Sequence, residues 1–248
     1  ESPENGVLWR SIRISHTRLI KFAREASSMN LSPNISPRWV DYICSQQCLH
    51  ISWCNVWCHD PSSTSCNFFD MYVAVGYQET ASDGVLCFSW KSKDYAVGAL
   101  IEGEDPQASA TMKVKENLID GIYDRQAQQC YYSSDNFNPW FRLDLGSVIP
   151  VRRIMMVLQP GILAVYTKDI EVRISTEKVL EEDFPLQRLF GLFEGPAEAN
   201  EEVIFQYNHS ILARYVTVQR LSTQPSCKST GLTSHVLCQI QVCHVEIN

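Results

Sequence analysis

The chain has 248 residues, of which 45% are hydrophobic, and a formal net charge of −7 at pH 7. This composition is sufficient for a packed core, and the acidic balance argues against nucleic acid or an anionic membrane surface as a general partner, because both attract basic proteins. The most apolar stretch, around residues 148–166, is interrupted by Arg152, Arg153 and Pro160-Gly161, so the sequence predicts no membrane span.

Cysteines and sequons predict a secreted glycoprotein. The chain has ten cysteines, an even number, and Asn-X-Ser sequons that start at Asn30, Asn34 and Asn208. Pro37 follows the Asn34 sequon, so we expect glycan on the other two asparagines more often than on Asn34. The start at Glu1 is interpreted as that of a mature chain whose signal peptide has been removed. In an extracellular protein of this kind we expect all ten cysteines to be oxidised.

The first region, residues 1–95, is predicted to be a small disulfide-rich α+β domain. Ser36-Pro37 is typical of a helix start, with serine as the N-cap and proline at the first helical position, and the helix is expected over residues 39–48. Cys44 and Cys48 are four residues apart and would share one face of this helix. Alternating or β-rich runs predict strands at residues 11–15, 67–73 and 85–90.

The second region, residues 108–248, is predicted to be a β-sandwich after a linker over residues 96–107, which contains Gly98, Gly103 and Pro106. Apolar and polar residues alternate through Arg142-Leu-Asp-Leu145 and Gln239-Ile-Gln-Val242, as in strands with one buried face. Strands separated by turns and not by helices favour a sandwich. They are expected at residues 140–145, 153–158, 170–174, 203–207, 214–220 and 236–245.

The second region resembles the discoidin and F-type lectin (fucolectin) family of jelly-roll domains. The similarity rests on four sequence marks that occur in the family's order. These are Asn117-Leu-Ile-Asp-Gly121, Asn138-Pro-Trp-Phe-Arg-Leu-Asp-Leu-Gly146, Asp169-Ile-Glu-Val-Arg-Ile174, and Ala213-Arg-Tyr-Val-Thr-Val218 with Leu237-Cys-Gln-Ile240 after it. The resemblance implies a mainly β fold in which Trp140 is buried, and a role in recognition.

The residues that bind fucose in that family are replaced here. Its fucose-binding members use one histidine and two arginines, and the corresponding positions hold Tyr132, Gln159 and Tyr166. The adjacent cysteine pair beneath the family's pocket is replaced by Ile162-Leu163. We therefore keep two alternatives open: these three residues form a modified ligand pocket, or they are ordinary loop residues.

The resemblance also implies one structural calcium ion beside the Asp120-Gly121 turn. The corresponding positions supply one side-chain carboxylate and several backbone carbonyls, a set that binds calcium weakly. They are Asn117, Asp120, Ile122, Gln129, Cys238 and Gln239, the last in place of a glutamate.

The first region resembles the PAN/apple family through Cys44-x3-Cys48-x5-Cys54 and the run Cys66-Asn-Phe-Phe-Asp-Met-Tyr72. A PAN-like region before a discoidin-like one is similar to secreted proteins of invertebrates, arthropods especially. The PAN pattern implies Cys48–Cys54 and Cys44–Cys66, which leaves Cys58 with Cys87. The lectin pattern implies Cys130–Cys238, which leaves Cys227 with Cys243, and no bond between the two regions is expected.

Three other interpretations compete with recognition. Zinc at Cys54, Cys58, His59 and Cys66 does not suit an even cysteine count beside sequons. The common catalytic motifs are absent from the sequence, so an enzyme is not predicted, and Asp120 and Asp144 are interpreted as turn and strand residues. The third is a structural component of an extracellular assembly or homo-oligomer, in which a basic run at residues 8–24 would meet an acidic run at residues 177–202.

From the sequence we predict a non-catalytic, secreted protein that binds a glycan or a glycoprotein, with the assembly component as the alternative.

Overall fold

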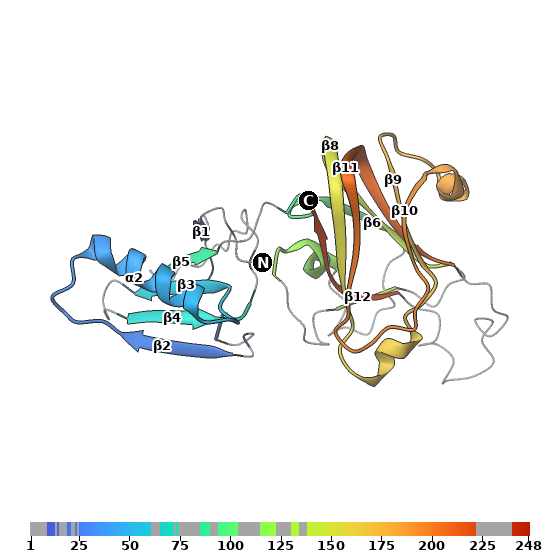
Figure 1. Ribbon diagram of the computed structural model, residues 1–248. Helices are drawn as coiled ribbons and strands as arrows, with labels where there is room; N and C mark the ends of the chain where they lie inside the picture. Colours follow the sequence, from blue (N-terminus) through green and yellow to red (C-terminus); the bar gives the residue numbers. More distant parts are fainter. Residues whose placement is uncertain are drawn as a thin grey trace. The chain divides into compact units, whose positions relative to one another are not determined.

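The protein is mainly β and consists of two compact units (Figure 1). Unit 1 comprises Glu1–Asp94 with Gly121–Tyr123, and unit 2 comprises Tyr95–Asp120 with Asp124–Asn248. Within the described residues, no helix is long and apolar enough to cross a membrane. The computed structural model describes residues 9–12, 14, 19–20, 23, 25–60, 65–71, 73, 85–89, 94–103, 115–122, 130–133, 138–221 and 240–248.

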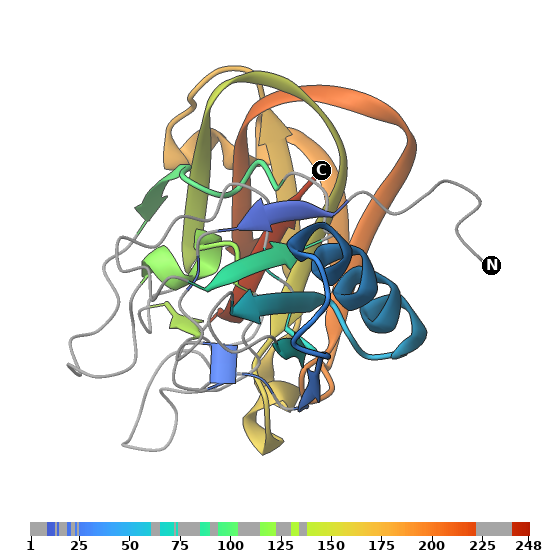
Figure 2. The same cartoon turned by 90° about the vertical axis from the view of Figure 1, so that its left-hand side faces the viewer.

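Unit 1 contains an antiparallel sheet with the helix α2 packed against it (Figure 2). The helix α2 spans Pro37–His50, with Ser36 as N-cap and proline in the first turn, so the predicted helix is confirmed. The strands in spatial order are β1 (Arg10–Ile12), β5 (Leu86–Ser89), β3 (Val56–Asp60), β4 (Ser65–Phe69) and β2 (Ala26–Asn30).

Three disulfides stabilise unit 1, and they are the three predicted pairings. Cys44–Cys66 joins α2 to β4, and Cys48–Cys54 closes the turn after the helix. Cys58–Cys87 joins β3 to β5 at positions that face each other in the register. Because the sulfurs of Cys54, Cys58 and Cys66 are bonded to other cysteines, the set considered for zinc has no free thiolate.

Unit 2 is built on a seven-stranded sheet in the order β10-β9-β11-β8-β12-β7, with β6 on β8. All the pairings are antiparallel. The strands are β6 (Leu100–Gly103), β7 (Tyr131–Tyr132), β8 (Trp140–Leu158), β9 (Ile170–Ser175), β10 (Arg188–Phe193), β11 (Glu202–Arg220) and β12 (Gln241–Ile247). Short 3-10 helices η1 (Lys115–Ile119), η3 (Ile162–Tyr166) and η4 (Glu181–Leu186) lie between them.

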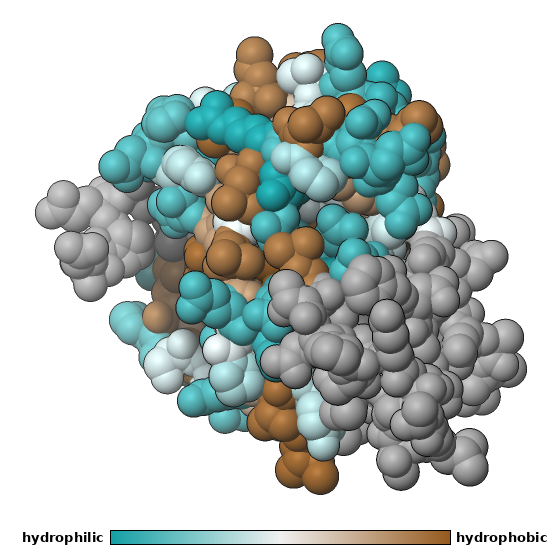
Figure 3. All heavy atoms as spheres, turned by 90° about the vertical axis from the view of Figure 1, so that its right-hand side faces the viewer, coloured by the Kyte–Doolittle hydropathy of each residue, from teal (hydrophilic) through white to brown (hydrophobic). Residues whose placement is uncertain are grey.

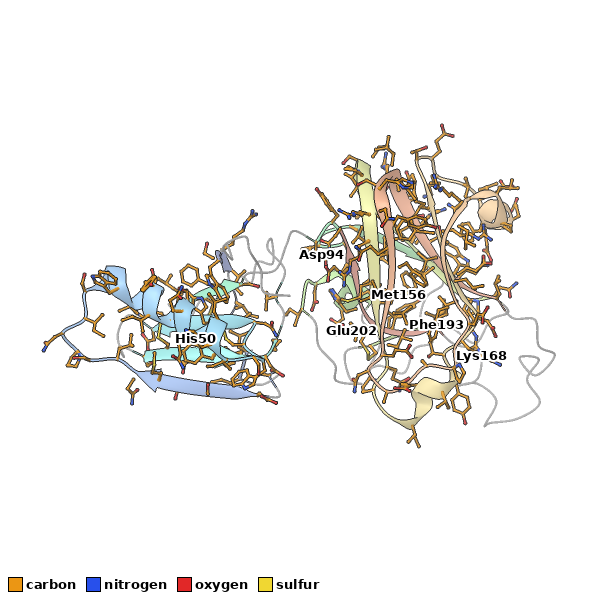
Figure 4. The ribbon with its side chains drawn as sticks, viewed as in Figure 1. His50, Asp94, Met156, Lys168, Phe193 and Glu202 are labelled. Carbon is orange, nitrogen blue, oxygen red and sulfur yellow. A yellow bond between two sulfur atoms is a disulfide. The ribbon has the colours of Figure 1, made fainter. Side chains whose placement is uncertain are left out.

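Two long strands connect the two layers of unit 2. The first part of β8 pairs with the end of β11 and with β6, whereas its last part pairs with the beginning of β11 and with β12. Register shifts in β11 fall between these parts, at residues 206–211 and 213–215. The expected strand pairs 140–145 with 153–158 and 203–207 with 214–220 are thus halves of β8 and β11. Buried side chains from all these strands form one core, in which Met156 is labelled in Figure 4.

Trp140 does not have the position predicted for it. Its side chain is only partly buried and contacts Phe184, with the two rings 4.9 Å apart. Successive residues of a strand point to opposite faces, so Phe141 and Leu143 enter the core while Trp140 shares the other face with Arg142. The prediction of a buried Trp140 was therefore wrong, although the strand that carries it was correct.

The predicted linker over residues 96–107 contains a strand. Leu100–Gly103 pair with residues 141–144 of β8 as β6. Gly103 is a packing residue there, because a Cβ at this position would lie 2.8 Å from the Trp140 carbonyl oxygen. Glycine in this stretch thus marks a close approach of two strands, and the described part of the linker belongs to unit 2.

The disulfide pairing predicted for unit 2 was also wrong. Cys130 is bonded to Cys243, which rules out Cys130–Cys238 and Cys227–Cys243. The register explains the pairing: Tyr131 faces Val242 across β7 and β12, so the next residues outward, Cys130 and Cys243, face each other with their Cα atoms 3.7 Å apart. Cys227 and Cys238 lie outside the described residues.

Candidate functional site

Two loops lie side by side at one end of unit 2, where β8 ends and β9 begins. The η3 loop, residues 159–169, contains η3, and the second loop comprises residues 194–201. Backbone hydrogen bonds join them: Asn200 N–H donates to the Gln159 carbonyl (3.1 Å), and Ala197 N–H donates to the Thr167 carbonyl (3.0 Å). The Asp169 N–H donates to the Glu194 carbonyl at 3.3 Å. We call this hydrogen-bonded pair of loops the two-loop platform.

The two loops can approach this closely because residue 195 is glycine. Its φ is +72°, and a Cβ there would lie 2.6 Å from the Cβ of Lys168 and 2.9 Å from the Thr167 carbonyl oxygen. Lys168 lies beside η3 at this end of unit 2 (Figure 4). Asp169 and Asn200 also have positive φ values, of 55° and 60°. The backbone of both loops is therefore held in conformations that non-glycine residues rarely adopt.

The outer surface of the η3 loop is apolar. Ile162 is 88% exposed, Val165 50% and Tyr166 37%. These side chains follow Gly161, whose φ is +91°. An exposed tyrosine next to aliphatic side chains gives this end of the unit a surface that can contact an apolar face of a ligand while its hydroxyl makes a hydrogen bond.

Beneath this surface, three polar side chains have buried oxygen atoms that lack a hydrogen-bond partner among the described residues. They are Gln159 Oε1, Thr167 Oγ1 and Asn200 Oδ1. Gln159 is 4% exposed and Thr167 fully buried. Buried polar atoms are nearly always paired with protein, ordered water or a ligand. The two-loop platform therefore contains three acceptors whose donors, ordered water or other groups, are not among the described residues.

Two of the three predicted ligand residues lie in one loop at this end of the unit, and the third lies on β7. Gln159 and Tyr166 belong to the same loop, but Gln159 is buried, so it lies under the surface and not on its rim. The strand register gives the position of the Tyr132 backbone. Tyr132 pairs with Gln241 of β12, and the neighbouring Tyr131 pairs with Val242, which in turn pairs with Leu158 at the end of β8. Two strand spacings, about 10 Å, thus separate the backbone of Tyr132 from the end of β8. The side chain of Tyr132 lies outside the described part.

Sequence reasoning missed Thr167 and Asn200. Thr167, which precedes a strand, carries no distinguishing signal in the sequence around it. The signal available was Asn200 itself, since asparagine is enriched at positive φ in turns.

The predicted calcium positions are described only in part. Gly121 has a φ of +78°, which confirms the Asp120-Gly121 turn. Ile122 is 2% exposed, packs in the core of unit 1 and pairs with Val73, so only its backbone could bind a cation. Asp120 is the one carboxylate in the described part of the set, while Gln129, Cys238 and Gln239 lie outside it. A calcium site here remains a prediction.

Charged side chains gather on the outer face of β8, away from the core. Arg142 bonds to Glu102 at 2.5 Å and to the Val179 carbonyl at 2.7 Å. Hydrogen bonds from Arg142 and Lys178 lower the pKa of the Glu102 carboxyl. Arg214 forms two hydrogen bonds with Asp144, at 2.7 and 2.9 Å, and lowers the pKa of that carboxyl. An Asp144 held ionised in this way is a structural ion-pair partner and not a general acid.

Comparisons with known proteins identify the fold of unit 2 and not a family. No protein-family model and no curated protein sequence matches the chain. Among solved structures, a fucolectin from striped bass (Morone saxatilis) serum is 20% identical, with a TM-score of 0.51 over 62% of this chain and 47% of that one. The chain therefore matches about half the length of that lectin.

Two further structures are similar at a lower level. The lectin domain of lectinolysin, solved with Lewis b antigen, is 17% identical with a TM-score of 0.45, covering 63% of this chain and 96% of that one. A fucose-binding module of Streptococcus pneumoniae is 9% identical with a TM-score of 0.46, covering 63% and 97%. The likeness to the bass fucolectin shows that the chain contains a fold of the F-type lectin and discoidin kind, as the sequence predicted.

Proposed function

We propose that the protein is a secreted, non-catalytic recognition glycoprotein and that unit 2 binds carbohydrate at the two-loop platform. The observation that carries the proposal is the set of buried, unpartnered oxygens of Gln159, Thr167 and Asn200 beneath an exposed apolar rim. A sugar has hydroxyl donors for such acceptors and C–H faces that pack on a ring such as that of Tyr166. The bass fucolectin, itself a lectin, has the same kind of fold and supports this proposal.

The ligand would be bound by different side chains from those that bind fucose in the F-type lectins. The aligned positions hold neutral side chains, Tyr132, Gln159 and Tyr166, where those lectins use one histidine and two arginines. Neutral donors and acceptors make weaker hydrogen bonds than charged ones. We therefore expect affinities in the millimolar to high micromolar range for a single sugar, with a preference for neutral glycans.

Further parts of the proposal concern unit 1 and the processing of the chain. The helix-on-sheet arrangement and disulfides of unit 1 support a PAN/apple-like domain, and its α2 exposes Trp39 and Tyr42. Asn30, Asn34 and Asn208 are all exposed, as N-glycosylation requires. A calcium ion near Asp120 is proposed as a structural cofactor of unit 2.

A glycan array probed with the intact chain tests this proposal. Binding is expected to at least one class of neutral glycan, and Tyr166→Ala should reduce it about tenfold, since loss of one stacked aromatic costs about 1–2 kcal/mol. Tyr42→Ala, which removes an exposed tyrosine from unit 1, is the matched control and should have no effect on this binding. A repeat in a calcium chelator tests the metal. Binding that both variants reduce equally, or an array without a single hit, would contradict the proposal.

A further inference from the structure

A concave surface lies at the end of β9 opposite the η3 loop. β9 starts at Ile170, just after the η3 loop, and ends at Ser175, where the chain continues into residues 176–187. We call residues 176–187 the strap. It contains η4, and with Arg188 and residues 211–212 of β11 it surrounds a groove of about 490 Å³. That volume is in the range of ligand pockets.

The strap is firmly attached, so the groove is a built feature of unit 2. Phe184 is fully buried, and its ring packs edge-on against Trp140. Arg142 donates to the Val179 carbonyl at 2.7 Å, and Lys178 is bonded to Glu102 at 2.5 Å. These contacts join the middle and the beginning of the strap to β8 and β6.

Gln187 presents an unpaired acceptor in the wall of the groove. The side chain is 5% exposed, and its Nε2 donates to Ser175 Oγ at 3.0 Å. Ser175 Oγ itself donates to the Glu177 carbonyl at 2.7 Å, so it must accept from Gln187, which fixes the orientation of the amide. Gln187 Oε1 is then left buried without a partner among the described residues. Only a hydrogen-bond donor can satisfy it.

The negative charges around the groove also favour a ligand with hydrogen-bond donors. Glu177 and Asp183 line it, and neither forms a salt bridge with a described residue. Lys178, the only cation of the strap, is paired with Glu102, so it does not neutralise them. Arg188 is the single cationic residue among those lining the groove. The described lining therefore carries two negatively charged side chains and one positively charged side chain.

The remaining walls are aliphatic. Leu186 is 82% exposed and Leu212 62%, and both line the groove. Apolar and hydrophilic side chains are interspersed on the side of unit 2 shown in Figure 3, and not separated into an apolar and a charged face. A lysine or arginine side chain matches such a surface, because its aliphatic stem packs on apolar groups while its head only donates.

We propose that the strap groove is a docking site for a lysine- or arginine-bearing segment of a protein partner. The stem of the basic side chain lies between Leu186 and Leu212, and its head donates to Gln187 Oε1 and to the carboxylates of Glu177 and Asp183. A neutral saccharide fits less well, because the carboxylates of Glu177 and Asp183 bind a cationic head more strongly than neutral hydroxyls. The site is independent of the two-loop platform and of the sugar binding proposed there.

Amide NMR of the ¹⁵N-labelled intact chain tests the proposal, with the peptide acetyl-Ala-Leu-Lys-Leu-Ala-amide as the probe. We expect shifts of the Gln187 side-chain amide and of the strap, and no saturable binding of the same peptide with an Nε-acetylated lysine. Asp183→Asn should weaken binding about two- to fivefold, as expected for a partly exposed ion pair. Gln187→Glu, which adds a charged acceptor, should tighten it.

Two controls separate this site from its surroundings. Glu181→Gln removes the same charge from the strap at a residue that lines a different hollow, so it should leave the dissociation constant within a factor of two. Tyr166→Ala should leave it unchanged, even if that variant abolishes glycan binding. Equal binding of the two peptides, shifts confined to other surfaces, or tighter binding by Asp183→Asn would overturn the proposal.

Discussion

The disulfide between Cys130 and Cys243 should be the main covalent support of the candidate site. β7 is only two residues long and pairs with β12 at two positions, so its backbone pairing alone holds it weakly. The bond spans a sequence separation of 113 residues. Closing a loop of this length in the unfolded chain removes entropy worth about 5 kcal/mol, an upper value because strain and residual structure reduce it.

Replacing both cysteines by alanine should therefore lower the free energy of unfolding of unit 2 by about 3–5 kcal/mol. Urea unfolding followed by the amide NMR signals of β8 and β11 measures it, because both strands lie in unit 2. Glycan binding should weaken as well, since β7 carries Tyr132. The control is the variant in which Cys48 and Cys54 are both replaced by alanine. Their disulfide lies in unit 1 and spans a sequence separation of 6 residues, so its loss should leave the unfolding free energy of unit 2 unchanged. A loss below about 1 kcal/mol in unit 2, or peptide mapping that joins Cys130 to another cysteine, would refute the reasoning.

Three further perturbations follow from the contacts in unit 2. Gly195→Ala should lower the free energy of unfolding by about 1–3 kcal/mol more than Gly98→Ala does, because both residues have positive φ but only a Cβ at residue 195 would overlap its neighbours. Thermal unfolding of the two variants measures the difference. Equal losses of stability would contradict the close packing of the two-loop platform. Asp144 has a lowered pKa, so its pairing with Arg214 stabilises the fold fully above about pH 4 and is lost as the pH falls through the lowered value. Acid unfolding of Asp144→Asn should thus be less pH-dependent than that of the native chain, and an unchanged acid transition would exclude this pair as a cause. Arg142→Met should lower the free energy of unfolding by about 2–3 kcal/mol and increase the rate of amide hydrogen exchange in the strap, because the hydrogen bond to the Val179 carbonyl is lost. An unchanged exchange rate in the strap would show that Arg142 does not stabilise it.

Much of the fold could be predicted because its signals are local. The helix α2 begins where serine and proline mark its start, and the alternation in β8 and β9 indicates strands with one buried face. The pairings in unit 1 followed from a resemblance in cysteine spacing. Strand ends were harder, because the bends of β8 and β11 occur within continuous pairing and leave no turn residue at which to separate the halves.

The errors have a common physical origin in the register of strands. Trp140 shares the outer face of β8 with Arg142, as the alternation of side chains along a strand requires. The large apolar area of the tryptophan side chain had favoured burial instead. Cys243 faces Cys130 because β7 and β12 pair at Tyr131 and Val242, and the sequence alone does not specify that register. β10 was missed for another reason: Gly191 interrupts its strand pattern, and in the fold the ring of Phe205 occupies the space where a Cβ would lie.

The candidate site could be located from the sequence only in outline. Gln159 and Tyr166 were chosen by resemblance, and the fold places them in one loop. Thr167 and Asn200 could not be found, because their importance comes from backbone hydrogen bonds between loops that are about 30 residues apart along the chain. The strap groove depends in the same way on Gln187, which becomes significant only because Ser175 fixes its amide.

Unit 2 is proposed to bind carbohydrate at the two-loop platform. Titration of the ¹⁵N-labelled intact chain with the best array glycan, followed by amide NMR, tests it most directly. We predict saturable shifts of the backbone amides of residues 159–169 and 194–201 and of the side-chain amides of Gln159 and Asn200, with none in the strap. Shifts confined to the strap, to unit 1 or to no residue at all would contradict it.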